Sequence, residues 1–184
     1  MNNWNRIWKP IVVLSLICVV VTGALAATNE VTAPIIEEAT IAAENAARAE
    51  VLPEADSFSP VEGITVEGVS AVYTADNGAG AAITASAKGY GGDVVVMVGI
   101  NADGNIEAIT VTQQAETKGI GSNVVDNPEY LAKYSGLSAA QPLVLNQDVD
   151  AYTSATVSST AVINASRSSS STAALEITVS RAEV

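Results

Sequence analysis

The most restrictive feature of this sequence is an uncharged apolar run close to its amino terminus. Residues Pro10 to Ala27 read PIVVLSLICVVVTGALAA and contain no acidic or basic side chain. As a helix, this run would span roughly 27 Å, which is close to the hydrocarbon thickness of a bilayer. We therefore expect a transmembrane helix over residues 10–27, preceded by a short cytoplasmic segment over residues 1–9.

The residues that flank the run predict its orientation. Basic and aromatic side chains precede it and acidic side chains follow it: Trp4, Arg6, Trp8 and Lys9 on one side, and Glu30, Glu37 and Glu38 on the other. Positive charge is retained in the cytoplasm, and tryptophans favour the membrane interface. The pattern predicts a single-pass protein of the cell (inner) membrane, with the rest of the chain on the extracytoplasmic side.

A cleaved signal peptide is the alternative interpretation of the same run. Ala24-Leu25-Ala26 has the small-x-small pattern of a cleavage site. The run is longer than the apolar core of most signal peptides, however, and no polar spacer precedes that pattern. We favour the uncleaved anchor, and either interpretation exports the remainder of the chain.

Composition excludes several kinds of function. The 184 residues include 20 Asp and Glu against eight Lys and Arg, a formal charge of −12, which disfavours nucleic acid as a partner. The sequence has no histidine, and Cys18, its single cysteine, lies within the apolar run. The usual transition-metal ligands, a cysteine-ligated cluster and an internal disulfide are thereby excluded. Redox chemistry in this chain would require an organic cofactor.

The exported part divides into a helical and linker segment over residues 28–65 and a domain over residues 66–184. Glu37 to Glu50 is rich in alanine and glutamate with helical spacing of its apolar positions. This helix would continue from the membrane segment or lie just beyond it. Pro34 suits its start, and Pro53 lies beyond its end.

The domain pattern changes to strands between Val66 and Val111. Apolar alternation, the turn signals Asn77-Gly78 and Asn101–Asn105, and the run Val94–Ile100 predict an antiparallel meander with a buried face. We expect an α+β fold in which this sheet is flanked by short helices. One such helix is predicted over Asn127–Tyr134, with Pro128 in its first turn.

Four further segments receive structural interpretations. Leu143–Val149 is predicted as an edge strand, and Leu175–Val179 as another strand. Ser166–Thr172 reads SRSSSST and is predicted as a solvated, partly helical surface run. Tyr90, in the sequence Gly-Tyr-Gly-Gly, is interpreted as the packing aromatic of a turn rather than as a cofactor contact.

The segment Asp150–Ser159 carries the strongest chemical pattern. It reads DAYTSATVSS, with five hydroxyl side chains between Thr153 and Ser159 and a helix predicted beyond them. Short hydroxyls at a helix start can bind a phosphate, because the first amides of a helix are free and its dipole favours an anion. Composition alone also fits a solvated capping loop.

This segment resembles the covalent-flavin motif of the FMN-binding domain family, Asp-x-x-Ser/Thr-Gly-Ala-Thr-x-Ser/Thr. Five positions match, and a serine replaces the usual glycine: the matches are Asp150, Thr153, Ala155, Thr156 and Ser158, and the replacement is Ser154. The resemblance implies that the Thr156 hydroxyl is esterified to the FMN phosphate. It also implies a separate flavin transferase that recognises Asp150 and transfers FMN from FAD.

A second motif of that family matches the sequence ETKGIG. Glu116, Thr117, Gly119 and Gly121 coincide with the family pattern Glu-Thr-Pro-Gly-Leu-Gly, whereas Lys118 and Ile120 depart from it. In the family this loop packs against the flavin ring. The resemblance therefore implies a cofactor site formed by Thr153, Ser154, Ala155, Thr156, Ser158, Glu116, Thr117, Gly119 and Ile120.

The anchor and the sequence that follows it are similar to the G subunits of Rnf-type electron-transport complexes, which are related to the C subunits of sodium-pumping NADH:quinone reductases. This resemblance implies an electron-carrying protein without its own catalytic acid or base, in a complex that couples electron flow between ferredoxin and NAD to ion translocation. Its partners would be the other membrane proteins of that complex. The alternative is a free-standing exported flavoprotein that passes electrons to extracellular acceptors.

Overall fold

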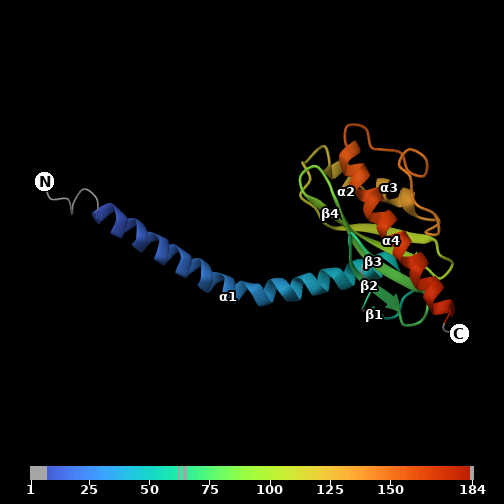
Figure 1. Cartoon of the computed structure of the whole chain (residues 1–184), viewed down its shortest axis with the longest axis horizontal. Helices are drawn as coiled ribbons and strands as arrows, with labels where there is room; N and C mark the ends of the chain where they lie inside the picture. The colour runs from blue at the N-terminus through green and yellow to red at the C-terminus, as the bar shows by residue number, and fades with distance from the viewer. Residues whose placement is uncertain (1–7, 62, 64–65, 183–184) are drawn as a thin grey trace. The chain divides into compact units, whose positions relative to one another are not determined.

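The computed structural model describes residues 8–61, 63 and 66–182 of the chain. Trp4 and Arg6, which the sequence assigns to the cytoplasmic end of the anchor, lie outside the described residues. The chain divides after Ala43 into two compact units. The elements follow the order of one long helix, five strands, three short helical segments and a final helix (Figure 1).

The first element, α1 (Lys9–Val51), is a continuous helix of 43 residues. It contains the predicted span, and it is the one helix in the described part of the chain that is long and apolar enough to cross a bilayer, by length and composition. Pro34 lies inside α1 rather than at the start of a second helix. One proline removes a single intrahelical hydrogen bond, and the Ala- and Glu-rich sequence beyond it favours the helix strongly.

The sheet is an antiparallel meander in which the strands lie in chain order. Its members are β1 (Phe58–Pro60), β2 (Val69–Ala75), β3 (Gly80–Lys88), β4 (Asp93–Asn101) and β5 (Ile106–Gln113). This confirms the predicted meander. Strand β1 lies where the sequence predicts a linker, and Pro60 is accommodated there because β1 is an edge strand.

The two predicted turns connect β2 to β3 and β4 to β5. The Asn77 side chain accepts a hydrogen bond from the Ala79 amide, and Gly78 has a φ of 75°. In the second turn, the Asn101 side chain accepts hydrogen bonds from the amides of Asp103 and Asn105. Both asparagines thus act as local acceptors that fold the backbone back on itself.

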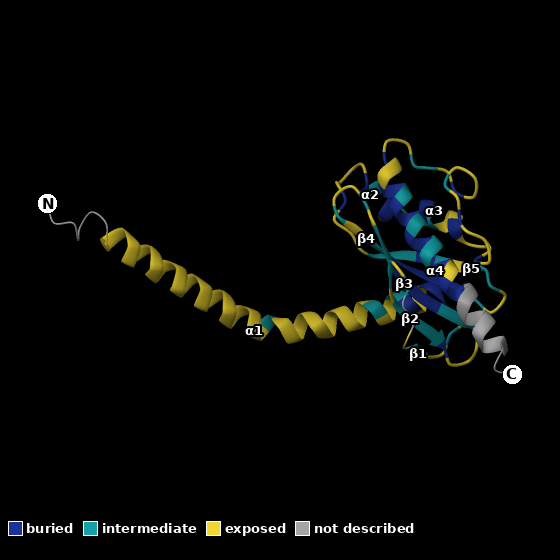
Figure 2. Ribbon diagram, in the orientation of Figure 1, coloured by how far each residue is buried: buried dark blue, intermediate teal, exposed yellow. Residues whose placement is uncertain are grey.

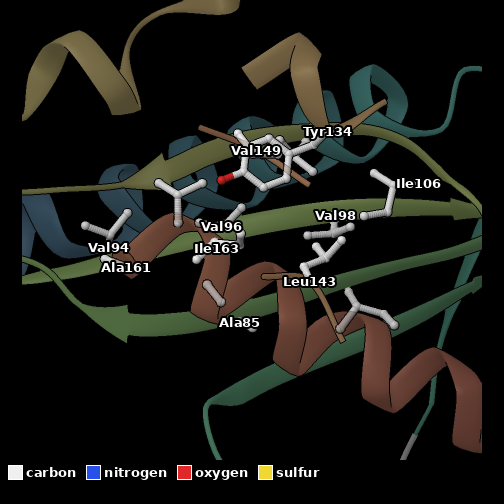
Figure 3. Close-up of a cluster of buried hydrophobic side chains, with 14 of the residues drawn as sticks. Ala85, Val94, Val96, Val98, Ile106, Tyr134, Leu143, Val149, Ala161 and Ile163 are labelled. Carbon is white, nitrogen blue, oxygen red and sulfur yellow. The ribbon is translucent and has the colours of Figure 1, made fainter. Parts of the chain in front are cut away.

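The main core lies between the sheet and the last helix, α4 (Thr156–Ala182), which packs mainly on β3 and β4 (Figure 1). Figure 3 shows alternate side chains of β4 directed towards α4. They meet buried residues of that helix: Val94, Val96 and Val98 of β4, and Ala161 and Ile163 of α4. The sequence predicts short helices here, but α4 has 27 residues.

The opposite face of β4 is also covered. Met97 packs with Val51 at the end of α1, and a Cβ added at Gly99 would meet the Val51 carbonyl oxygen. The Arg48 guanidinium lies 3.7 Å from the ring centroid of Tyr73 in β2. The nearly continuous apolar sequence of β4 therefore reflects burial on both faces, whereas the sequence predicted a single buried face.

The prediction of a solvated Ser166–Thr172 run is wrong. Ser166, Ser169 and Ser170 lie inside α4 and are buried, as Figure 2 shows for the middle of this helix. Each of these three hydroxyls donates a hydrogen bond to the backbone carbonyl four residues earlier, so that burial leaves no unpaired donor among them. The predicted strand over Leu175–Val179 is wrong as well, because α4 continues through it.

The predicted edge strand over Leu143–Val149 is also incorrect. Only an isolated bridge joins Leu145 to Val149 within this described segment. Asn146 has a φ of 63°, and the Val144 amide donates to the Asp148 carboxylate, so the segment closes into a local turn. This turn leads directly into the hydroxyl-rich motif.

Three short helical segments lie between β5 and this turn: α2 (Ser122–Val125), α3 (Pro128–Leu131) and η2 (Ala132–Tyr134). The last two confirm the helix predicted over Asn127–Tyr134. Asn127 caps it through its side chain, and Pro128 occupies the first position. Tyr134 is fully buried in the core, and its hydroxyl has no hydrogen-bond partner among the described residues (Figure 3).

Candidate functional site

The hydroxyl-rich motif forms a short loop that ends at the first residue of α4. Thr156 begins the helix, and the Ala155 amide donates to the Tyr152 carbonyl just before it. Ser154 has a φ of 71°, in the left-handed region that favours glycine. The backbone thus keeps at Ser154 the conformation for which the motif usually carries glycine.

The structure separates the five hydroxyls of this motif into two groups. Ser158 and Ser159 are buried and hydrogen-bonded, with the Ser159 hydroxyl donating to the Ala155 carbonyl. Thr153, Ser154 and Thr156 are exposed, and their hydroxyls have no hydrogen-bond partner in the described part of the chain. Of these three, Thr156 alone stands in the first turn of a helix, where backbone amides lack intrahelical acceptors.

The buried Ser158 hydroxyl reaches a carboxylate from the second motif. It donates a hydrogen bond of 2.5 Å to Oε2 of Glu116, which is 8% exposed. The other oxygen, Oε1, accepts hydrogen bonds from the amides of Tyr90 at 2.8 Å and Gly91 at 3.0 Å. One carboxylate thus joins the Gly-Tyr-Gly-Gly turn, the ETKGIG loop and the first turn of α4.

Glycines enclose this carboxylate closely. A Cβ added at Gly89 would meet Oε1 of Glu116, and one added at Gly121 would meet Oε2 and the Ser158 hydroxyl. These two positions therefore need glycine because the carboxylate occupies the space of a side chain. Gly119, by contrast, faces open space but has a φ of 81°, so glycine there satisfies the backbone of the loop.

Three large apolar side chains are exposed on the three segments that meet at this carboxylate. Tyr90 is 77% exposed, and Ile120 and Val157 are each 51% exposed. Tyr90 donates to Glu116 through its own amide, and Val157 precedes Ser158, whose hydroxyl donates to the same carboxylate. Ile120 precedes Gly121, where an added Cβ would meet this carboxylate. Outside α1, the described residues include two other exposed large hydrophobics, Trp8 and Val144. We call Tyr90, Ile120 and Val157 the apolar patch.

The prediction that Tyr90 packs within a turn is wrong, because its ring is largely exposed. The turn itself needs the glycines that flank Tyr90, and the tyrosine amide donates to Glu116, but the ring is left outside. Sequence reasoning did not identify Val157 or Gly89 as parts of the site. In the sequence, Val157 follows Thr156 and Gly89 precedes Tyr90. This adjacency indicates a place in the site only when the structure shows that the three segments meet.

The remaining predicted site residues lie on the surface of the domain. Thr117 and Lys118 are exposed, and the Gly119 amide donates to the Ser122 hydroxyl at the start of α2. Asp150, at the start of the hydroxyl-rich loop, is exposed as well and so is open to a protein partner. In the described part of the chain, no three acidic or cysteine side chains are grouped to hold a metal ion.

Comparisons with known proteins agree with this geometry. Residues 89–170, which contain all three segments joined by Glu116, match the family model of the FMN-binding domain. Residues 1–51 match the RnfG N-terminal region, which ends where α1 ends. The fold and site therefore define a membrane-helix protein with an FMN-binding domain.

Individual relatives narrow the assignment. The G subunit of the Na⁺-translocating ferredoxin:NAD⁺ oxidoreductase complex of Acetobacterium woodii is 33% identical, over 87% of this chain and 88% of the relative. The G subunit of the ion-translocating oxidoreductase complex of Methanosarcina acetivorans is 28% identical, over 90% and 93%. The crystal structure of Shewanella oneidensis NqrC is similar over 66% of each chain, at 23% identity and a TM-score of 0.46. The chain belongs to the family of G subunits of ion-translocating oxidoreductase complexes.

Proposed function

We propose that this protein is the membrane-anchored FMN carrier of an ion-translocating ferredoxin:NAD⁺ oxidoreductase complex, with FMN attached to Thr156. The observation that carries the proposal is the exposed Thr156 hydroxyl at the first residue of α4, followed by the exposed Val157 of the apolar patch. Its family membership and the names of its relatives support the complex. The electron-carrying group of this chain would then be the flavin.

The residues around Thr156 suit both ends of an FMN molecule. A phosphate on the Thr156 oxygen would lie at the amino end of α4, where free amides and the helix dipole favour negative charge. The apolar patch offers an aromatic ring and two aliphatic side chains to the flat isoalloxazine system. The flavin would supply the electron-transfer chemistry, while these residues position it and shield one side from water.

The attachment reaction needs only a hydroxyl from this chain. The Thr156 oxygen would form a bond to the phosphorus of the FMN half of FAD, and the diphosphate bond would break so that AMP leaves. The proton of the Thr156 hydroxyl would pass to a base of the transferase. Exposure of Thr156 and of Asp150 leaves both open to such an enzyme. The absence of histidine is consistent with this division of labour, because the nucleophile is activated by the partner.

The extracytoplasmic side is proposed from charge. Lys9 precedes the apolar part of α1, whereas Glu30, Glu37 and Glu38 follow it on the same helix. On that side of the membrane a covalent bond would prevent loss of the cofactor by diffusion. Protease added to intact spheroplasts should remove the domain, and the same protease added to inverted membrane vesicles should leave it intact.

Intact mass spectrometry tests the attachment directly. The full chain is co-expressed with a flavin transferase, with Thr156→Ala and Thr153→Ala as matched variants of two exposed threonines in one loop. We expect the mass of one FMN unit, and flavin fluorescence that survives denaturation, in the wild type and in Thr153→Ala. Thr156→Ala should have neither. Loss of the label in Thr153→Ala with retention in Thr156→Ala would overturn the assignment.

A further inference from the structure

Glu116 has an environment that the attachment reaction does not explain. Among the acidic residues whose side chains the structure describes, it alone is buried. A buried carboxylate is unfavourable unless it is fully hydrogen-bonded. Here the amides of Tyr90 and Gly91 and the hydroxyl of Ser158 satisfy both oxygens.

The donors to this carboxylate come from segments that are far apart in the sequence. The Tyr90 amide lies 26 residues before Glu116, and the Ser158 hydroxyl lies 42 residues after it. Ser158 follows Thr156 by two positions within the first turn of α4. The carboxylate is therefore the common partner of the turn that carries Tyr90 and the helical turn that carries Thr156.

We propose that Glu116 is a positioning residue for cofactor attachment. Its carboxylate fixes the first turn of α4 relative to the Gly89–Gly92 turn, so that the Thr156 hydroxyl and the apolar patch have one relative placement before FMN arrives. The inference rests on the proposed function, and it assigns Glu116 a role that does not require contact with the flavin ring. Preorganisation of this kind lowers the entropic cost of bringing a bulky donor to its acceptor.

Two substitutions at Glu116 distinguish a variant that can keep these hydrogen bonds from one that loses them. In Glu116→Gln, the amide oxygen can still accept from Tyr90 and Gly91, and the amide nitrogen can donate to the Ser158 oxygen. In Glu116→Ala, all three donors lose their acceptor. A positioning role therefore predicts rescue by glutamine.

The experiment follows the rate of FMN attachment to the full chain by intact mass, at a temperature where every variant is folded. We expect Glu116→Ala to slow attachment at least about tenfold, and Glu116→Gln to remain within about threefold of the wild type. Val98→Ala, in the buried core of β4, supplies a destabilised control that should keep the wild-type rate, with Ile163→Val in its place if the first variant does not fold. Glu107→Ala removes an exposed glutamate as the surface control.

Amide hydrogen exchange on the chain without FMN gives a second, cofactor-independent measurement. Glu116→Ala should speed exchange at Tyr90 and Gly91 and over residues 156–159, whereas Val98→Ala should leave these positions near the wild-type rate. Equal slowing of attachment in Glu116→Ala and Val98→Ala, or unchanged exchange in Glu116→Ala, would overturn the proposal. If the wild-type chain never acquires FMN, the proposed function fails, and the exchange data alone decide whether Glu116 holds these segments.

Discussion

The Ser158 hydroxyl and the Glu116 carboxylate are joined by a hydrogen bond although they lie 42 residues apart in the sequence, and both are buried. The Ser158→Ala substitution would leave Oε2 of Glu116 buried without a donor. An unsatisfied buried acceptor costs about 1–3 kcal/mol, so we expect the free energy of unfolding to fall by that amount. Urea denaturation of the full chain in detergent measures it.

Thr160→Ala is the matched control for this loss. The Thr160 hydroxyl donates to the Thr156 carbonyl of its own helix, in an exposed hydrogen bond that water can replace. We expect a change within about 0.5 kcal/mol. Equal losses for the two variants would show that the hydrogen bond between Ser158 and Glu116 contributes no more to the free energy of unfolding than an exposed one.

Replacing Ser154 by glycine should stabilise the loop before α4. Ser154 has a φ of 71°, which glycine adopts without the steric penalty of a Cβ. Relief of that penalty is partly offset by the greater freedom of glycine in the unfolded chain, so a gain of about 0.5–1 kcal/mol is expected. Ser154→Ala keeps the Cβ and should give no such gain. A loss of stability in Ser154→Gly would contradict this account.

Gly99→Ala should weaken the attachment of the end of α1 to the sheet. The new Cβ would meet the carbonyl group of Val51, which is backbone and cannot rotate away. Overpacking of this kind costs roughly 1–3 kcal/mol, measured as a lower midpoint of thermal unfolding. Gly92→Ala is the comparison, because its Cβ would have one neighbour, the Ala115 Cβ at 3.3 Å. A larger loss for Gly92→Ala would refute the prediction.

Tyr134 should make the domain sensitive to alkaline pH. Burial, together with the neighbouring Tyr130, raises the pKa of the Tyr134 phenol well above its ordinary value of about 10. Below about pH 10 the Tyr134 phenol keeps its proton in both the folded and the unfolded chain, so the free energy of unfolding does not depend on this group's ionisation. Above about pH 10 only the unfolded chain releases the proton, so the free energy of unfolding falls as the pH rises. At about pH 11 the loss is about 1.4 kcal/mol, and it should be absent in Tyr134→Phe.

The comparison is made between urea midpoints at neutral and alkaline pH. At neutral pH, Tyr134→Phe should be at least as stable as the wild type, because the hydroxyl that it removes has no partner among the described residues. Tyr90→Phe, at an exposed position, should keep the alkaline loss of the wild type. An identical alkaline loss in Tyr134→Phe would show that another group is responsible.

The meander and the anchor could be predicted because their signals are local. Asparagine and glycine fix the turns at Asn77-Gly78 and Asn101–Asn105, and an uncharged run of sufficient length identifies a membrane span without knowledge of its neighbours. The Ser166–Thr172 run was mispredicted because composition counts hydroxyls as solvated. In the structure these serine hydroxyls donate hydrogen bonds to backbone carbonyls of their own helix, which allows them to be buried in a core. Amino-acid composition does not show such bonds.

The centre of the site was beyond sequence reasoning for a different reason. Each of its motifs gives residues that could matter, but the shared role of Glu116 depends on three segments meeting in space. The hydroxyl pattern likewise offers five candidates, and only the folded structure shows that the hydroxyls of Ser158 and Ser159 are buried and hydrogen-bonded. The family motif singles out Thr156, and the burial of Ser158 and Ser159 would keep these two hydroxyls from competing with it in the proposed attachment.

If FMN is attached to Thr156 as proposed, the place of this residue in α4 would link cofactor attachment to the order in which the chain is made. The five strands of the described residues all precede α4, yet the sheet cannot bury its core face until that helix packs on β3 and β4. A chain interrupted before α4 would contain the strand segments and the apolar helix but no acceptor hydroxyl in a formed helical turn. A flavin on Thr156 would therefore mark only those molecules whose synthesis and folding had both passed α4, so that truncated copies in the membrane would carry no electrons.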